Sequence, residues 1–295
     1  MKKAVITILV LLAGLTFLNQ AGFCAPTPEQ WGVIMNISGR QRMLSQKMSK
    51  EALLVAAKIN PEENKNKLKD TMKLFETSLQ ALMEGNAAMN IPVCELPEIL
   101  EQLEKVQTLY ADLNVIFAKM VEGEVADIVE MQQIAKASLP LLTAADKAVQ
   151  MFGEEAKKVL VKDPSLATAI NIAGRQRMLS QKMAKEALLL HLKVDMDAQI
   201  QALSKTVALF DKSLKGLKFG DNEMGLPPLK QDDISAQLDI VESSWLALKP
   251  AADKIASSAL QYPITKDEIT SVCGLTDTIL AESNKAVGMF EKLAQ

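Results

Sequence analysis

An internal repeat is the feature that most constrains how this chain can fold. Residues 39–48 (Gly-Arg-Gln-Arg-Met-Leu-Ser-Gln-Lys-Met) return letter for letter at 174–183, an offset of 135 residues. The same offset pairs many apolar residues further along, and it lengthens to 138 near the end of the chain. The sequence therefore predicts a tandem duplication, with one copy at 26–162 and a second at 163–295. Each copy has the size of an ordinary domain.

The repeated stretch retains polar residues as well as apolar ones. Between 67–86 and 202–221 only eight of twenty positions match, and these are mostly apolar residues at helical spacing. In the repeat, by contrast, the arginines, glutamines, serine and lysine all match. Packing alone tolerates change on a solvated surface, so the retained polar residues indicate a function. A recent local duplication is the alternative explanation.

The first 25 residues read as a signal peptide. Lys2 and Lys3 precede an apolar run that is too short for a membrane span, and Cys24-Ala25-Pro26 marks a processing point. Phe23 is bulky where lipid attachment to Cys24 favours a small residue, so cleavage and release are favoured over a lipoprotein. The mature chain is expected to be periplasmic or secreted.

Composition excludes several classes of function. Without Lys2 and Lys3 the chain has 31 basic and 36 acidic residues, a balance that argues against nucleic acid or an anionic membrane as partner. A single histidine, His191, and the lack of CxxC or ExxH spacing argue against a haem, zinc or di-iron centre. No catalytic constellation is evident, so no enzymatic activity, metal or cofactor is expected. Cys94 and Cys273 lie at non-equivalent places and are predicted to remain separate thiols.

Apolar periodicity and helix-start signals predict an all-α chain of two tandem antiparallel four-helix bundles. The expected helices of the first copy are 27–58, 62–84, 95–121 and 124–161, the last with a kink at Pro140. Those of the second copy are 164–194, 196–218, 230–258 and 264–293, with an interruption at Pro250.

The repeat lies on the first helix of each copy and divides into faces at 100° per residue. One face is ordinary core and includes Gln41. A second face is small and apolar around a single cation, formed by Trp31, Met35, Ser38, Gly39, Arg42, Gln46, Ser49 and Leu53. Such a face allows another helix to approach closely, with Arg42 and Gln46 directed into the contact. Arg40, Arg175 and Lys47 fall elsewhere and are expected to face water.

The pattern Asn-x-(Ser/Ala)-Gly-x-x-Arg-Met-x-Ser on this helix resembles the NarX-like sensor domain. That family includes nitrate/nitrite sensor kinases and the N-terminal domain of PilJ-type pilus chemoreceptors. The sequence Arg-Gln-Arg-Met-Leu-Ser-Gln is more similar to the PilJ-type branch than to the nitrate kinases. In the nitrate sensors, two first helices meet and one arginine from each holds a single anion. The matching positions here are Arg42 and Arg177. Arg40, Arg175, Gln46 and Gln181 depart from the nitrate-sensor pattern.

The resemblance implies a binding module for a nitrate- or nitrite-like oxyanion or another small ligand. With the signal peptide and no catalytic constellation, the module is expected to be periplasmic and non-enzymatic, and, unlike most of the family, to have no output domain of its own. The expected ligand-binding residues are Arg42, Arg177, Gly39, Gly174, Gln46 and Gln181. In the alternative reading, each arginine pairs with a local carboxylate or bonds to carbonyl groups at a helix end. A rival function is docking of a chemoreceptor or a type IV pilus component through the motif face of the helix.

Overall fold

A computed structural model describes residues 25–160 and 165–294 of the chain. The signal-peptide prediction and the predicted boundary between the copies lie outside the described residues. Within them the protein is all-α, as predicted, with eight α-helices and one short 3₁₀ turn. The helices are α1 (Pro28–Ala56), α2 (Pro61–Glu84), α3 (Pro97–Val121), α4 (Ile128–Val159), α5 (Ser165–His191), α6 (Met196–Phe219), α7 (Asp232–Ser258) and α8 (Lys266–Lys292).

Several helix starts follow from local sequence chemistry. Thr27 accepts a hydrogen bond from the backbone N–H of Gln30 while the Gln30 side chain accepts one from the Thr27 N–H, and Pro28 occupies the first helical position. The same reciprocal cap opens α4, at Asp127, and α8, at Thr265. These two positions are 138 residues apart, so the duplication extends to the caps.

Two predicted details of the helices are wrong. The fourth helix begins at Ile128 rather than near residue 124, because the Asp127 cap sets its start. The third helix of the second copy is not interrupted at Pro250, since α7 continues through this residue. The lost N–H of a proline weakens a helix, but Leu248 and Ala252 on either side are buried and hold α7 against the bundle.

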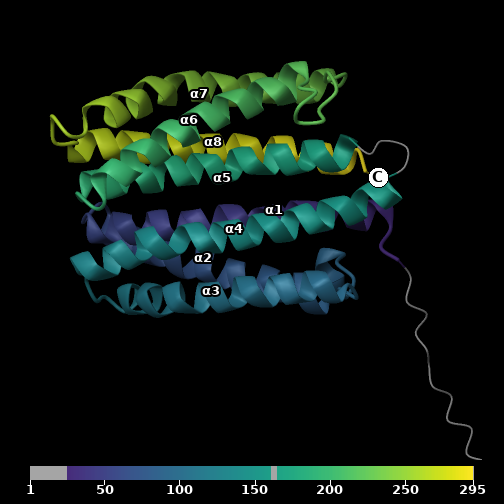
Figure 1. The fold of residues 1–295 in the computed structure, drawn as a ribbon, viewed down its shortest axis with the longest axis horizontal. Coiled ribbons are helices and arrows are strands. Elements are labelled where there is room, and N and C mark those ends of the chain that lie inside the picture. Colours follow the sequence, from purple (N-terminus) through teal and green to yellow (C-terminus); the bar gives the residue numbers. More distant parts are fainter. Residues whose placement is uncertain (1–24, 161–164, 295) are drawn as a thin grey trace, which may run out of the picture.

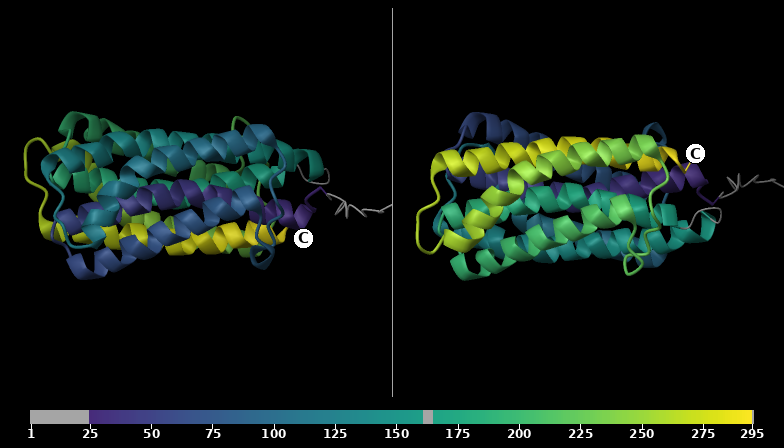
Figure 2. Two further views of the ribbon diagram at one scale, coloured as in Figure 1. Left: turned by 90° about the horizontal axis from the view of Figure 1, so that it is seen from below. Right: turned by 90° about the horizontal axis from the view of Figure 1, so that it is seen from above.

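The helices run roughly along one common axis and form two bundles that lie side by side (Figures 1 and 2). We call α1–α4 copy 1 and α5–α8 copy 2. In each copy the first helix packs against the second and the fourth, and α1 and α5 also pack extensively against each other. The first helix of each copy therefore lies in the middle of the molecule.

This central position explains the unusual burial of α1 and α5. A surface helix buries one apolar stripe, whereas α1 is buried on nearly every side over residues 34–55, including many of its polar residues. One side contacts its own bundle and the other contacts the neighbouring bundle. The repeated motif is therefore located at the contact between the copies.

The two thiols are free, as predicted. Cys94 is half-buried in the connection before α3, and Cys273 is buried in α8. His191 ends α5, where its Nδ1 lies 2.9 Å from the carbonyl oxygen of Ile264. Among the helices of the described residues, none is both long and apolar enough to cross a bilayer.

Candidate functional site

The small face of the motif helix forms the contact between the copies. Ser38, Gly39, Arg42, Gln46 and Ser49 are all buried there, as the helical wheel predicted. The glycines allow the close approach. A Cβ atom at Gly39 would lie 3.4 Å from Nη2 of Arg177 and 3.5 Å from Nη2 of Arg42. At Gly174 the corresponding distances are 3.3 and 3.4 Å, so both guanidinium groups converge on the same pair of glycines.

Arg42 is paired with a carboxylate. Its Nη1 lies 2.5 Å from Oδ1 of Asp146 on α4, and its Nη2 donates to the backbone carbonyl of Asn171 on α5 at 3.1 Å. Arg42 is fully buried, whereas the Asp146 side chain is 28% exposed. Copy 1 therefore supplies the counter-charge for its own arginine, and the alternative reading of local pairing holds for Arg42.

Arg177 is equally buried, but its hydrogen bonds to the described residues all go to neutral oxygens. Its Nη1 donates to the side-chain oxygens of Asn36, at 2.8 Å, and Asn284, at 3.2 Å, and its Nη2 donates to the backbone carbonyl of Asn36 at 3.2 Å. Asn284 occupies in copy 2 the position that Asp146 occupies in copy 1, 138 residues earlier. A single carboxylate-to-amide difference therefore leaves Arg177 without an ion pair among the described residues.

The surroundings of Arg177 lower the pKa of its guanidinium to about 9, mainly through burial and then through the positive charges of Arg40 and Arg42, against a weaker opposing effect of Glu291. The group still remains protonated at neutral pH. Burial also lowers the pKa of Arg42, with Asp146 opposing the effect. Burial alone would raise the pKa of Asp146, but the adjacent Arg42 outweighs it and the net direction is downward.

Arg40 and Arg175 were predicted to face water, and this prediction is wrong. Both are only partly exposed, and burial lowers the pKa of Arg40 while Glu291 opposes that effect. The charge of Arg40 acts on Arg177, and the charge of Arg175 acts on Arg42. The helical wheel of one bundle did not account for the neighbouring bundle, which covers this side of the helix. Four arginines thus gather around two carboxylates, Asp146 and Glu291.

The motif glutamines each bond to the fourth helix of their own copy. Gln46 donates from Nε2 to the carbonyl oxygen of Ser138 on α4 at 3.3 Å, and Gln181 donates to the carbonyl oxygen of Thr276 on α8 at 3.2 Å. Their Oε1 atoms have no partner among the described residues, and neither does Nε of Arg42 or Arg177. Acceptors and donors of the motif are therefore left unsatisfied inside the contact.

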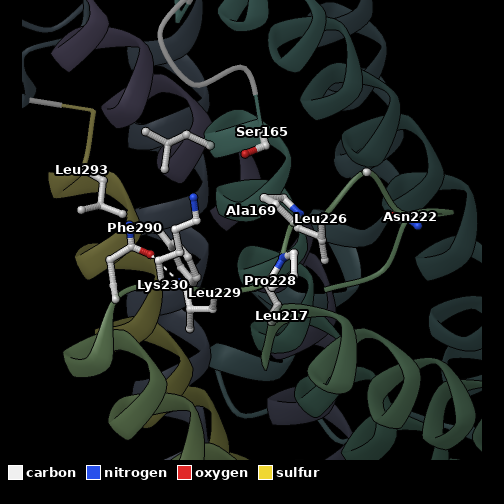
Figure 3. Close-up of a pocket in the computed structure, with 14 residues that line it drawn as sticks. Ser165, Ala169, Leu217, Asn222, Leu226, Pro228, Leu229, Lys230, Phe290 and Leu293 are labelled. Atoms are coloured by element: carbon white, nitrogen blue, oxygen red, sulfur yellow. Dashed lines mark hydrogen bonds between the residues drawn. The ribbon is translucent and has the colours of Figure 1, made fainter. Parts of the chain in front are cut away.

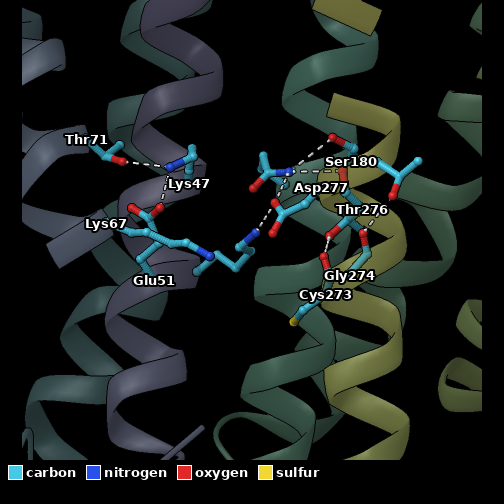
Figure 4. Close-up of polar contacts among 12 residues, drawn as sticks. Lys47, Glu51, Lys67, Thr71, Ser180, Cys273, Gly274, Thr276 and Asp277 are labelled. Carbon is cyan, nitrogen blue, oxygen red and sulfur yellow. Dashed lines mark hydrogen bonds and ion pairs between the residues drawn. The ribbon is translucent and has the colours of Figure 1, made fainter. Parts of the chain in front are cut away.

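Two buried lysines at the end of the repeat extend the contact and were missed as site residues. Lys50 pairs with Asp277 on α8 of the other copy, and Gln181 also approaches Asp277 (Figure 4). The equivalent Lys185 reaches α4 of copy 1 but meets only the hydroxyl of Ser138, at 3.0 Å. Leu139 occupies the position in copy 1 that corresponds to Asp277. The match of Lys50 with Lys185 in the repeat was the available signal.

The pKa of the Lys185 ammonium is lowered to about 8, mainly by burial and further by Lys182, although Glu186 opposes the effect. Copy 2 thus contributes two buried cations, Arg177 and Lys185, that no carboxylate of the described residues pairs with directly. Their copy 1 counterparts are both paired.

Lys47 was also predicted to face water, and this prediction is wrong. It is mostly buried and pairs with Glu51 four residues along the helix and with the hydroxyl of Thr71 on α2, at 2.8 Å (Figure 4). Lys182 repeats these contacts in copy 2. Within the described part of the chain there is no cluster of three histidine, cysteine or acidic side chains suited to a metal ion.

The fold and the contact together define a class of protein: a duplicated helical-bundle module whose two copies bury a cation-rich interface between their first helices. The family described as the type IV pili methyl-accepting chemotaxis transducer N-terminal region matches residues 29–123 and 160–270, and the chain belongs to this family. Each matched segment contains one copy of the motif. The family consists of chemoreceptor N-terminal sensing domains and is not an enzyme family. The predicted resemblance to the PilJ-type domain is therefore confirmed.

Two relatives from Pseudomonas aeruginosa extend the comparison. The chain is 32% identical over 125 residues to the methyl-accepting chemotaxis protein McpN, an alignment that covers 42% of this chain and 22% of that protein. It is 20% identical over 292 residues to Protein PilJ, covering 98% of this chain and 41% of that protein. One alignment therefore runs through both copies, and the chain spans less than half the length of either relative.

Proposed function

We propose that this chain is a periplasmic, non-enzymatic sensor module that binds a small oxyanion such as nitrate or nitrite between α1 and α5. The observation that carries the proposal is Arg177, which is buried, positively charged at neutral pH and paired only with neutral oxygens. An unpaired buried charge costs several kcal/mol. An anion that replaced one of the amide contacts would remove that cost.

The geometry suits a small planar anion. A guanidinium group offers parallel N–H donors that match the spacing of two oxygens in a carboxylate or nitrate. Nη2 of Arg42 and Nη2 of Arg177 both lie against Gly39 and Gly174, so one anion at the glycines can accept hydrogen bonds from both arginines. The motif glycines let the two guanidinium groups pack this closely, and a side chain at either position would push them apart.

The two arginines are expected to contribute unequally. Arg42 already has Asp146 as its counter-ion, whereas Arg177 has only Asn36 and Asn284. We therefore place the anion mainly on Arg177, with Arg42 as a second donor. The half-buried Arg40 adds to the positive potential around Arg177.

Binding at this position would be coupled to the packing of the two bundles. Arg177 of copy 2 holds Asn36 of copy 1, and Asn36 in turn donates to Glu291 on α8. An anion that displaces Asn36 from Arg177 loosens this cross-copy link. Such a change in the contact between α1, α5 and α8 is a means by which ligand binding alters the shape presented to a partner.

A second candidate function is docking of a membrane chemoreceptor or a pilus-associated protein, which the names of the two relatives favour. The motif face, however, is buried between the copies. Docking through that face requires the bundles to separate, and this makes the oxyanion proposal the better supported of the two.

The test is calorimetric titration of nitrate, nitrite and sulfate into the protein, with the variants Arg177→Met and Arg42→Met and the exposed control Lys105→Met on α3. At 100 times its dissociation constant a ligand stabilises the folded state by about 2.7 kcal/mol. We expect the Arg177 variant to abolish the heat of binding, the Arg42 variant to weaken binding, and the control to leave it unchanged. A wild-type protein that binds none of these anions but captures a chemoreceptor ectodomain would overturn the proposal in favour of docking.

A further inference from the structure

A cavity of about 660 Å³ opens at one end of copy 2, away from the arginine contact. Figure 3 shows Phe290 of α8 and Leu293, just after this helix, on one side and Ser165 and Ala169 of α5 on the other, with the loop before α7 between them. Apolar side chains form most of the wall, and Leu217, Leu226 and Phe290 are themselves buried. A cavity of this size and lining is within the range that small-molecule ligands occupy.

Copy 1 has the equivalent cavity, of about 480 Å³, at the same end of its bundle. Its lining includes Leu82, Ile91, Pro92 and Phe152, which correspond to Leu217, Leu226, Pro227 and Phe290 at the offsets of the duplication. Both copies have therefore kept an open, apolar space where larger side chains could have filled it.

The two cavities differ most in the charge at the mouth. Lys230 lines the copy 2 cavity, where no acidic residue contributes to the described lining. The equivalent position in copy 1 is Glu95, and the other charged residues there, Glu155 and Lys158, pair with each other at 2.6 Å. The copy 2 cavity thus presents one positive charge and the copy 1 cavity one negative charge.

The ammonium group of Lys230 is available to a ligand. In the described part of the chain no carboxylate pairs with it, and its backbone N–H alone is bonded, to the side chain of Gln231. Figure 3 shows the Lys230 side chain extending toward the space between Leu293 and Ser165. A cation at the edge of an apolar cavity favours a molecule that combines an apolar body with an anionic end.

The loop that forms the cavity wall is held in place before any ligand binds. Asp221 and Leu226 exchange backbone hydrogen bonds of 2.8 and 2.9 Å, and Asp221 also accepts from the N–H of Met224. Gly220 has φ +85°, and a Cβ atom there would lie 2.8 Å from the nitrogen of Pro228. Only glycine fits this position, so the turn is fixed and little ordering is required of the cavity on binding.

We propose that the copy 2 cavity binds a small amphipathic carboxylate, with its apolar chain between α5, α8 and the loop and its carboxylate on Lys230. The apolar wall supplies affinity through buried surface, and Lys230 makes the cavity prefer an anionic ligand over a cationic one. This second ligand site is independent of the anion contact at Arg177.

The experiment uses octanoate as the probe and octylamine as its counterpart of opposite charge, each titrated calorimetrically into the full chain. Two variants introduce residues that copy 1 already has at the equivalent positions. Ala169→Ile narrows the cavity with the larger residue that lines the smaller cavity of copy 1, Ile34, and Lys230→Glu reverses the charge to that of Glu95. Lys105→Glu, on the exposed face of α3, makes the same charge change in the other bundle and serves as the matched control.

We expect octanoate to bind the wild-type protein and the Lys105→Glu control alike, and Ala169→Ile and Lys230→Glu each to weaken binding at least tenfold. Octylamine should bind Lys230→Glu more tightly than wild type. Arg177→Met should leave octanoate binding unchanged, which separates this site from the nitrate contact. Absence of octanoate binding to wild type, or equal binding by all variants, would overturn the proposal.

Discussion

Lys50 and Lys185 occupy equivalent positions in the two copies, yet their replacement by methionine is expected to have opposite effects on stability. Lys185 is buried, contacts only the hydroxyl of Ser138, and has a pKa lowered from 10.5 to about 8, chiefly by burial. Each pH unit of lowering corresponds to about 1.4 kcal/mol. The protonated amine therefore destabilises the folded state by about 3 kcal/mol near neutral pH.

Lys185→Met removes this charge and loses one hydrogen bond, worth about 1 kcal/mol. The Ser138 hydroxyl keeps a partner, since it also donates to the carbonyl oxygen of Ala135. The net expectation is a gain of about 2 kcal/mol in the free energy of unfolding. Lys50→Met instead leaves Asp277 without its ion-pair partner, and because Asp277 is 44% exposed the expected loss is only about 1 kcal/mol.

The pH dependence has a defined sign. Because the folded protein releases the Lys185 proton at a lower pH than the unfolded chain does, the unfolded chain binds more protons between about pH 8 and 10.5. The stability of the wild type relative to Lys185→Met therefore rises with pH across this window, and the advantage of the variant fades.

Urea unfolding of both variants, followed by circular dichroism near pH 7 and near pH 10, measures these differences. The reasoning is refuted if Lys185→Met destabilises the protein as Lys50→Met does, or if its effect is the same at both pH values.

Three further outcomes are expected. Asp146→Asn gives copy 1 the residue that copy 2 has and leaves Arg42 without an ion pair. In the absence of anion it should lower the free energy of unfolding by about 2 kcal/mol, and it should enlarge the nitrate-dependent rise in melting temperature. An unchanged melting curve would contradict this. Gly174→Ala places a methyl group 3.3 Å from a guanidinium nitrogen and should weaken nitrate binding with little loss of stability, as calorimetry and thermal melting will show. The half-buried Cys94 should react with a thiol reagent in the native protein, whereas Cys273, whose pKa burial raises to about 12, should react only after unfolding.

The helices and the motif contact could be predicted from the sequence because their signals are local. Capping boxes, prolines at helix starts and apolar periodicity lie within a few residues of what they determine. The combination of Gly39 with nearby serines on one face indicated that a second helix would approach there, and the resemblance to the nitrate sensors implied that it would be the first helix of the other copy.

The charge pairing could not be predicted in the same way, since its partners lie on other helices. Arg42 meets Asp146 across 104 residues of chain, and Lys50 meets Asp277 across 227. A helical wheel of α1 alone predicted that Arg40 faces water, because it took no account of copy 2, which covers that side of the helix. Comparison of the copies at the offset of 138 does show that Asp146 and Asn284 occupy equivalent positions. The sequence alone does not show that this difference affects the charge next to Arg177, because that requires the positions of both arginines.

The central claim is that Arg177 accepts an anion because copy 2 lacks the carboxylate that neutralises Arg42. Asn284→Asp restores that carboxylate with almost no change in shape, so the most direct measurement is the nitrate-dependent shift in melting temperature of wild type and Asn284→Asp side by side. We predict that the variant is more stable than wild type without nitrate and that its nitrate-dependent shift is lost. A variant that responds to nitrate as strongly as the wild type would contradict the account.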